Sequence, residues 1–148
     1  MFSTDMLKGS GDPQVWIDAW PAISERTASG PLGVELMSIG EDEVVLEFEI
    51  TDASRQPMGL LHGGVSALVA ESAASLHSAF LADLTAQAPV GIDLNATHIS
   101  SARAGRVRVV GRVVRRASTH VFHQVDVIHL ETQRLLCTAR VTNYLKPL

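Results

Sequence analysis

The residues best suited to chemistry lie between positions 56 and 82, where Glu71 is the only formally charged side chain. A carboxylate in apolar surroundings is costly unless it reaches solvent or is held there for chemistry. Nine residues earlier, His62-Gly63-Gly64 precedes a long apolar run. At a helix start, unpaired backbone N–H groups and the helix dipole would polarise a carbonyl oxygen lodged there. Together they predict a base or nucleophile and an oxyanion site, which cleavage of an ester or thioester requires.

Helix geometry separates these two features within one chain. Nine residues of α-helix rise about 13 Å and turn through about 900°, so His62 and Glu71 lie on opposite faces. If both serve one reaction, the His62 end of one subunit must meet Glu71 of another, and a dimer is predicted. Ser75 lies four residues after Glu71 and therefore shares its face.

The elements around these residues predict an α+β fold in which one antiparallel sheet wraps around a long central helix. Residues 63–81 contain no Lys or Arg and read as a buried helix of about five turns. Asp12-Pro13 starts a short helix that we expect to end at Pro21. Alternating apolar residues predict six strands without helices between the last four, which should form hairpins. The predicted strands are residues 33–39, 43–51, 89–100, 105–117, 120–130 and 134–145.

Length, charge and cysteine content indicate the number of domains, the kinds of partner and the cellular compartment to expect. A chain of 148 residues fits one domain spanning residues 1–148, in which we expect residues 1–12 to be mobile. The net charge of −4 argues against a nucleic-acid partner. The single cysteine, Cys137, fits a reducing compartment, and no export signal or membrane anchor is apparent. We therefore expect a cytoplasmic protein.

Arginines and histidines form two further groups. Six of the twelve basic residues are arginines between positions 103 and 116, which either contact a small anionic ligand or cover solvated strand faces. Among the histidines, His120 and His123 are an odd number of residues apart on one strand and so face opposite sides of the sheet. We expect no metal site.

The pattern RQPMGLLHGGVSALVAES, with VGIDLNATH downstream, resembles that of the hotdog-fold acyl-CoA thioesterases. It is most similar to the branch that hydrolyses hydroxybenzoyl-CoA and 1,4-dihydroxy-2-naphthoyl-CoA, and the similarity runs from about residue 33 to the C-terminus. The resemblance implies hydrolysis of an aryl or other bulky acyl-CoA to free acid and CoA. It also implies a homodimer with shared sites, a homotetramer built from such dimers, and no cofactor.

The resemblance assigns roles to five catalytic residues. Glu71 would be the nucleophile or the general base for water, and Ser75 would orient that water. The backbone N–H of Gly63 and the side chain of His62 would hold the thioester oxygen. Gln56 would reach the reacting carboxylate or carbonyl, from the same subunit as His62 and Gly63.

The resemblance also implies a CoA-binding turn. Ser118 and Thr119 match the residues that meet the CoA phosphates, and Arg116 is close by. Residues 100 and 101 are both serine, where relatives usually have a pair such as Arg-Pro, and Arg103 would compensate for that departure.

Other functions remain open at this point. Gly64-Val65-Ser66 begins like the nucleophile elbow of a serine hydrolase, but Leu68 replaces its closing glycine. A hotdog hydratase or dehydratase, or a non-catalytic acyl-CoA-binding module, would keep the fold without thioester cleavage. The site residues also have ordinary alternatives, since Glu71 could face solvent and His62 could simply cap the helix.

Overall fold

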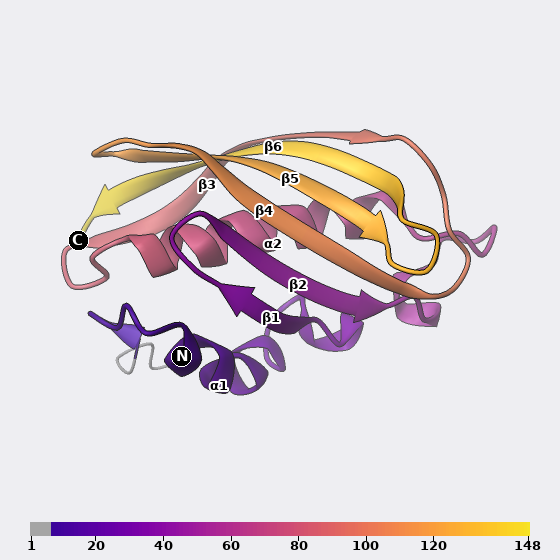
Figure 1. Cartoon of the computed structure of the whole chain (residues 1–148), viewed down its shortest axis with the longest axis horizontal. Coiled ribbons are helices and arrows are strands. Elements are labelled where there is room, and N and C mark those ends of the chain that lie inside the picture. The colour runs from indigo at the N-terminus through magenta and orange to yellow at the C-terminus, as the bar shows by residue number, and fades with distance from the viewer. Residues whose placement is uncertain (1–6) are drawn as a thin grey trace.

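The computed structural model describes residues 7–148. Its centre is the long helix α2 (Gly63–Leu81), over which a six-stranded sheet curves (Figure 1). All neighbouring strands are antiparallel, as the sequence pattern predicts, and their order is β1-β2-β4-β5-β6-β3. The expectation that hairpins join all of the last four strands is wrong for β3, which pairs with β6 and not with β4, because residues 99–105 carry the chain past β6 and β5 before β4 begins. The strands are β1 (Glu35–Ile39), β2 (Glu43–Glu49), β3 (Gln87–His98), β4 (Arg106–Arg116), β5 (His120–His129) and β6 (Arg134–Pro147).

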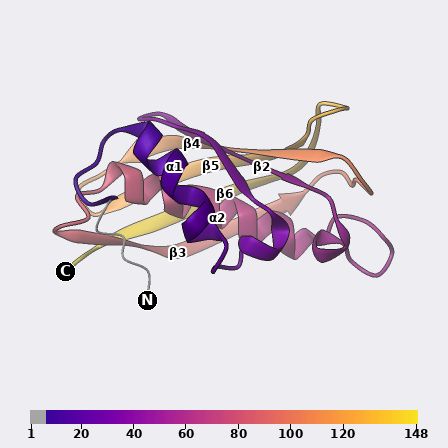
Figure 2. The same ribbon diagram turned by 90° about the horizontal axis from the view of Figure 1, so that it is seen from below.

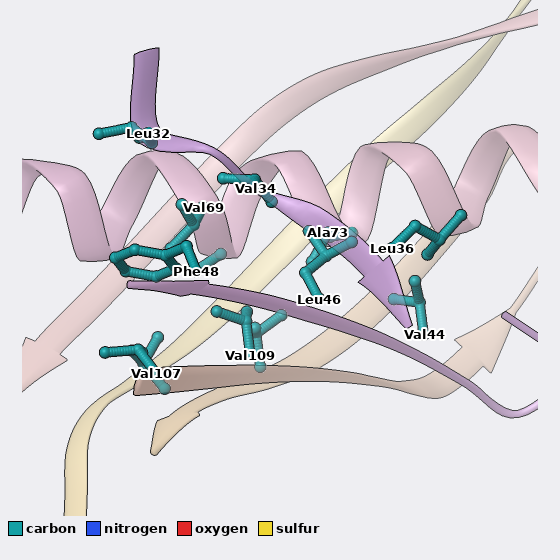
Figure 3. Packing of buried hydrophobic residues seen from close by; sticks show 14 of the residues in the cluster. Leu32, Val34, Leu36, Val44, Leu46, Phe48, Val69, Ala73, Val107 and Val109 are labelled. Carbon is teal, nitrogen blue, oxygen red and sulfur yellow. The ribbon is translucent and has the colours of Figure 1, made fainter. Parts of the chain in front are cut away.

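Helix α2 packs closely against the sheet because its buried stripe consists largely of small residues. Ala70, Ala73 and Ala74 are fully buried. Figure 3 shows Val69 close to Phe48 and Ala73 close to Leu46, both of β2. Side chains as small as alanine let the helix backbone approach the strands closely. The expected span of residues 63–81 is confirmed.

Helix α1 (Pro13–Ser24) is longer than expected, because it continues through Pro21. Asp12 caps its start by accepting a hydrogen bond from the Gln14 N–H (2.9 Å). Pro21 removes one helical hydrogen bond, yet Trp20 anchors the helix by donating from Nε1 to the Val34 carbonyl (2.7 Å). Tertiary packing therefore outweighs the helix-stopping effect of proline. Figure 2 shows α1 crossing α2 on the side away from the sheet.

The N-terminal segment expected to be mobile falls partly outside the described residues. Residues 1–6 lie outside them, whereas Leu7 is buried in the core. In residues 7–148, no helix is long and apolar enough to cross a membrane. Cys137 is fully buried, and burial raises the pKa of its thiol.

Strand β3 ends the sheet and leaves one side of its backbone unpaired by any strand of residues 7–148. It is twelve residues long and largely exposed. Its pairing with β6 directs Gly91 and His98 toward α2, while Asn95 and Thr97 face outward. A long open edge of this kind is a template for pairing with another strand.

Two histidines form a buried pair between α2 and β5. His77 Nε2 donates to the Gly40 carbonyl (2.7 Å), which leaves His77 Nδ1 to accept from His123 Nε2 (3.1 Å). Burial lowers the pKa of both rings, and the pKa of His123 falls to about 4 with a further contribution from His77. His123 is therefore the one of the two strand histidines that faces the core. Among residues 7–148 there is no cluster of three or more ligands that could hold a metal ion.

This pair should make the protein sensitive to acid. An unfolded histidine titrates near pH 6.5, so below that pH the unfolded chain binds protons that the folded pair excludes. Stability contributed by neutral His123 is complete above pH 6.5 and is lost as the pH falls toward 4, by about 3 kcal/mol for the shift from 6.5 to about 4. Urea unfolding between pH 7 and 4 measures this loss.

The matched variant is His123→Gln, which keeps a polar side chain but does not titrate. Its free energy of unfolding should fall less steeply between pH 6.5 and 4 than that of the unmodified protein. Parallel curves for the two proteins would contradict the assignment.

Candidate active site

The start of α2 presents a backbone donor to solvent. His62 caps the helix, and its Nδ1 accepts a hydrogen bond from the Gly64 N–H (2.8 Å), so Nε2 carries the proton of the neutral ring. The N–H groups of Val65 and Ser66 bond to the His62 carbonyl. Gly63 is therefore the residue of the first turn whose N–H finds no acceptor among residues 7–148. Such an N–H at the positive end of a helix can bind a developing oxyanion.

A cavity of about 250 Å³ adjoins this helix start. Gln56 and Gly63 both line it, so the structure brings these two predicted residues together. Gln56 Oε1 accepts from the Met58 N–H (2.6 Å), which leaves the side-chain NH₂ group available as a donor. The remaining lining residues are Leu60, Leu61, Ser66, His98, Ser100, Ser101 and Leu136.

Glu71 and Ser75 form a second group farther along α2. Glu71 is half-buried, with its Oε1 only 2.7 Å from where a side-chain carbon on Gly91 would lie. The Ser75 hydroxyl accepts from Asn143 Nδ2 (2.9 Å), and Asn143 is fully buried. Having accepted that bond, the Ser75 hydroxyl is free to donate its own proton. A water molecule between Ser75 and Glu71 would thus meet one donor and one acceptor.

One chain keeps the two groups apart. The helix start contacts β3 at His98, and Glu71 contacts β3 at Gly91. These strand residues are seven positions apart, about 23 Å along an extended strand. Within one chain the predicted site residues therefore form two separate groups, which are called half-sites below.

The predicted CoA-binding residues also divide between the two ends of α2. Arg116 donates to the Leu81 carbonyl at the helix C-terminus, and Thr119 Oγ1 lies 2.9 Å from His120 Nδ1. Ser118 belongs to the same turn between β4 and β5. Arg103 lies at the other end, where it donates to the Met58 carbonyl (2.7 Å). The structure does not bring Arg103 to the other three residues within one chain.

Several arginines of the strip between positions 103 and 116 have structural partners instead of a free face. Glu47 is buried between Arg106 (2.6 Å) and Arg108 (2.7 Å). Burial alone would raise the pKa of Glu47, but the hydrogen bonds from the two guanidinium groups outweigh it and lower that pKa. Arg112 pairs with Glu43 (3.4 Å) and Asp126 (3.6 Å). For these three arginines, the structure favours the interpretation that they cover strand faces over the one that they contact an anionic ligand.

An apolar cavity of about 440 Å³ lies over the C-terminal half of α2, where Leu76 and Ala79 line it. Trp16 and Ile23 of α1 line one side of it, and Pro89 of β3 lines the other. The Trp16 ring is held by edge contact with Phe80 (5.7 Å between centroids). The other lining residues are Leu7, Lys8, Leu76, Ala79, Leu84, Gln87, Ala88 and Leu148.

Sequence reasoning missed Asn143 and Gly91. The signal for Asn143 was a lone amide at an inward position of β6, between buried Val141 and Leu145. Gly91 gave no signal, because only the folded structure reveals that Glu71 occupies the space of its missing side chain. Ser66, the candidate nucleophile of a serine hydrolase, is buried, and this argues against that function.

Comparison with known proteins is consistent with this geometry. The family model of the Thioesterase superfamily matches residues 58–136. The chain is 35% identical over 129 residues to the 1,4-dihydroxy-2-naphthoyl-CoA hydrolase of Escherichia coli, covering 87% of this chain and 93% of that protein. It is 32% identical over 111 residues to the enzyme of the same name from Listeria monocytogenes, covering 75% and 89%.

Two solved structures with a similar fold are also thioesterases. A mutant of thioesterase PA1618 from Pseudomonas aeruginosa superposes with a TM-score of 0.85 at 26% identity, over 89% of this chain and 94% of that one. Thioesterase HI1161 from Haemophilus influenzae gives 0.83 at 28% identity, over 89% and 91%.

Proposed function

Because the chain belongs to the thioesterase superfamily and is a thioester hydrolase with the hotdog fold, we propose that its substrate is an aryl or other bulky acyl-CoA. The observation that carries the proposal is that the chain presents two chemically complementary groups. One offers an unpaired N–H at a helix start, and the other offers a carboxylate beside a free hydroxyl proton.

In the proposed reaction, the thioester oxygen accepts from the Gly63 N–H, assisted by the Gln56 amide and His62. Glu71 either takes a proton from a water molecule that Ser75 orients or attacks the carbonyl carbon itself. In either case the new C–O bond forms a tetrahedral intermediate, and its collapse breaks the C–S bond. In the general-base route, Glu71 passes the proton it took from water to the leaving sulfur, giving free acid and CoA. In the nucleophilic route, the collapse leaves an anhydride between Glu71 and the acyl group, which water then cleaves; this frees the acid and Glu71 and supplies the proton that the CoA sulfur takes up. These steps use side chains and water and call for no cofactor.

A two-fold dimer through β3 would complete the site. If the open edges of two copies pair antiparallel about a point near Asn95, His98 of one chain comes opposite the Gly91 region of the other. Glu71 of the partner subunit would then lie beside Gly63 of the first chain. The same pairing would carry the turn at Ser118 and Thr119 of one chain toward the Arg103 end of its partner, where CoA would bind. We propose that such dimers pair further into a homotetramer.

Cross-linking tests this dimer without using activity. Asn95→Cys should form a symmetric disulfide between subunits, because directly opposite residues in an antiparallel pair are about 4.5–5.5 Å apart at Cα. The native Cys137 is buried and should not interfere. Thr138→Cys, on the outer face of β6, is the control and should stay reduced. Equal cross-linking of the two variants, or none at Asn95, would contradict pairing through β3.

The apolar cavity between α1, α2 and β3 supports the proposal of a bulky acyl group. Its volume of about 440 Å³ lies within the range of about 300–1,000 Å³ typical of small-molecule pockets. Trp16 and Leu76 offer flat and branched apolar surface against which a ring would pack. We expect the cytoplasm, where acyl-CoA is made and used, to be the location.

A thiol-release screen tests the function. Purified protein should release free CoA from aryl and other bulky acyl-CoA substrates with higher kcat/KM than from acetyl-CoA. Product analysis separates this from the alternatives, because a hydratase or dehydratase changes the acyl chain and leaves the thioester intact. Binding without any thiol release would instead identify a non-catalytic acyl-CoA-binding module.

Gly91→Ala should lower kcat about 10²-fold without loss of stability. A methyl group there would lie 2.7 Å from Glu71 Oε1, so the carboxylate must move, and a displacement of about 1 Å can cost 10² in rate. The backbone at Gly91 is not in the left-handed region, and alanine is a better strand residue than glycine. Steady-state kinetics and thermal unfolding measure both effects. Gly11→Ala, where nothing lies within 4 Å, is the control, and a Gly91→Ala protein with normal kcat would contradict the placement of Glu71.

A further inference from the structure

His98 is the last residue of β3 and covers the start of α2. Its pairing with buried Cys137 directs the side chain inward. The ring then lies over Gly63, and a side-chain carbon at position 63 would be only 2.8 Å from His98 Nε2. The Nε2 end of the imidazole therefore occupies the space that the missing side chain of Gly63 leaves open.

The ring nitrogens of His98 are also uncommitted. In each of the other five histidines a ring nitrogen is within hydrogen-bond distance of a backbone or side-chain atom, at Gly64, Gly40, Thr119, His77 and Thr132. His98 has no hydrogen bond or ion pair within residues 7–148, and its side chain is exposed. A polar ring that is positioned by packing but left without a partner is available to a ligand.

The cavity beside His98 indicates which ligand group it would meet. His98, Gly63 and Gln56 line the same space of about 250 Å³. All three can present a hydrogen-bond donor there: an imidazole N–H, a backbone N–H and an amide NH₂. No carboxylate lines that cavity. A set of donors without an anion favours an oxygen that carries or develops negative charge.

We propose that His98 Nε2–H is a further donor of the oxyanion site, binding the thioester oxygen together with the Gly63 N–H. This inference rests on the proposed thioester hydrolysis. As the tetrahedral intermediate forms, negative charge moves onto that oxygen, and a donor already in place stabilises it more than the neutral ground state. His98 keeps its proton throughout and forms no covalent bond. Glycine is needed at position 63 because a larger side chain would push the imidazole away.

The kinetic test compares His98→Ala with His98→Gln. Loss of one oxyanion donor should lower kcat about 10²-fold while KM changes less than threefold. Glutamine keeps an N–H donor of similar reach, so the kcat of His98→Gln should be at least about tenfold higher than that of His98→Ala. Thr97→Ala is the matched control, since it alters the neighbouring residue of β3 on the opposite face and should leave kcat within twofold. A His98→Ala protein with kcat within threefold of the unmodified enzyme would overturn the inference, as would a Gln variant no better than Ala.

A second measurement does not depend on turnover. The probe is S-phenacyl-CoA, an aryl ketone that keeps a carbonyl oxygen near the thioester position but cannot be hydrolysed at sulfur. In ¹⁵N-histidine NMR, its binding should shift the Nε2–H resonance of His98, assigned by its absence in His98→Ala. Binding with no shift would overturn the inference and leave the proposed function intact. Failure of the unmodified enzyme to release thiol from any acyl-CoA would instead overturn the proposed function, and this inference with it.

Discussion

Glu71→Ala should lower kcat for thiol release about 10³-fold, the middle to upper range for loss of a general base. Glu71 Oε1 is the atom nearest to the side-chain position of Gly91 on β3, and Ser75 can orient a water molecule but cannot take its proton at neutral pH. The isosteric Glu71→Gln should lose as much, because it keeps the shape but not the basicity. Steady-state assays with the preferred aryl-CoA, compared with thermal unfolding of each variant, measure the loss.

Glu41→Gln is the control for this prediction. It removes one carboxylate from the exposed turn between β1 and β2, far from both half-sites, and should leave kcat unchanged. Retention of more than a tenth of the normal kcat in Glu71→Gln would contradict the assignment of Glu71. Single-turnover hydrolysis in H₂¹⁸O then separates its two possible roles, because only a nucleophilic Glu71 passes through an anhydride and acquires ¹⁸O in its own carboxylate.

Mixing two inactive variants should restore activity. In a heterodimer of Glu71→Ala and Gln56→Ala/His98→Ala chains, one composite site takes its oxyanion half from the first chain and its carboxylate from the second, so it is intact. The other site carries both defects. Random exchange makes half of the dimers mixed, each with one working site, so the activity should reach about a quarter of the unmodified value. Thiol release after denaturing and refolding an equimolar mixture measures it.

The outcome distinguishes a shared site from one built within a chain. If each chain held a complete site, the mixture would show only the summed residual activities of the two variants. Mixing Glu71→Ala with Ser75→Ala is the matched control, because both defects lie in the same half-site. That mixture should stay near its residual activity in either case.

The central helix could be predicted from sequence because local signals agree along its whole length. His62-Gly63-Gly64 marks its start, and the following run has no glycine or proline to interrupt it before residue 81. The absence of Lys and Arg from this helix also predicted the covering sheet. The end of helix α1 was predicted wrongly for the opposite reason. Pro21 is a local signal that should stop the helix, but a hydrogen bond from Trp20 to the carbonyl of Val34, just before β1, holds the helix in place beyond it.

Only those features of the site that depend on spacing along one helix could be predicted from sequence. His62 and Glu71 are nine positions apart, and this spacing was enough to predict that they lie on opposite faces of the helix. The contacts of Glu71 with Gly91, of Ser75 with Asn143 and of Gly63 with His98 link positions 20 to 68 residues apart. Such contacts depend on strand register, and a shift of one residue would turn each side chain to the other face of the sheet.

Pairing through the open edge of β3 would make the activity of the enzyme depend on its concentration. If two chains must pair before either half-site is complete, a newly made subunit has no thioesterase activity until it meets a second copy. At concentrations below the dimer dissociation constant, activity should rise with the square of the protein concentration, and above it in direct proportion. Catalytic competence is then a property of the population of chains, set by mass action, and dilution alone would switch the enzyme off.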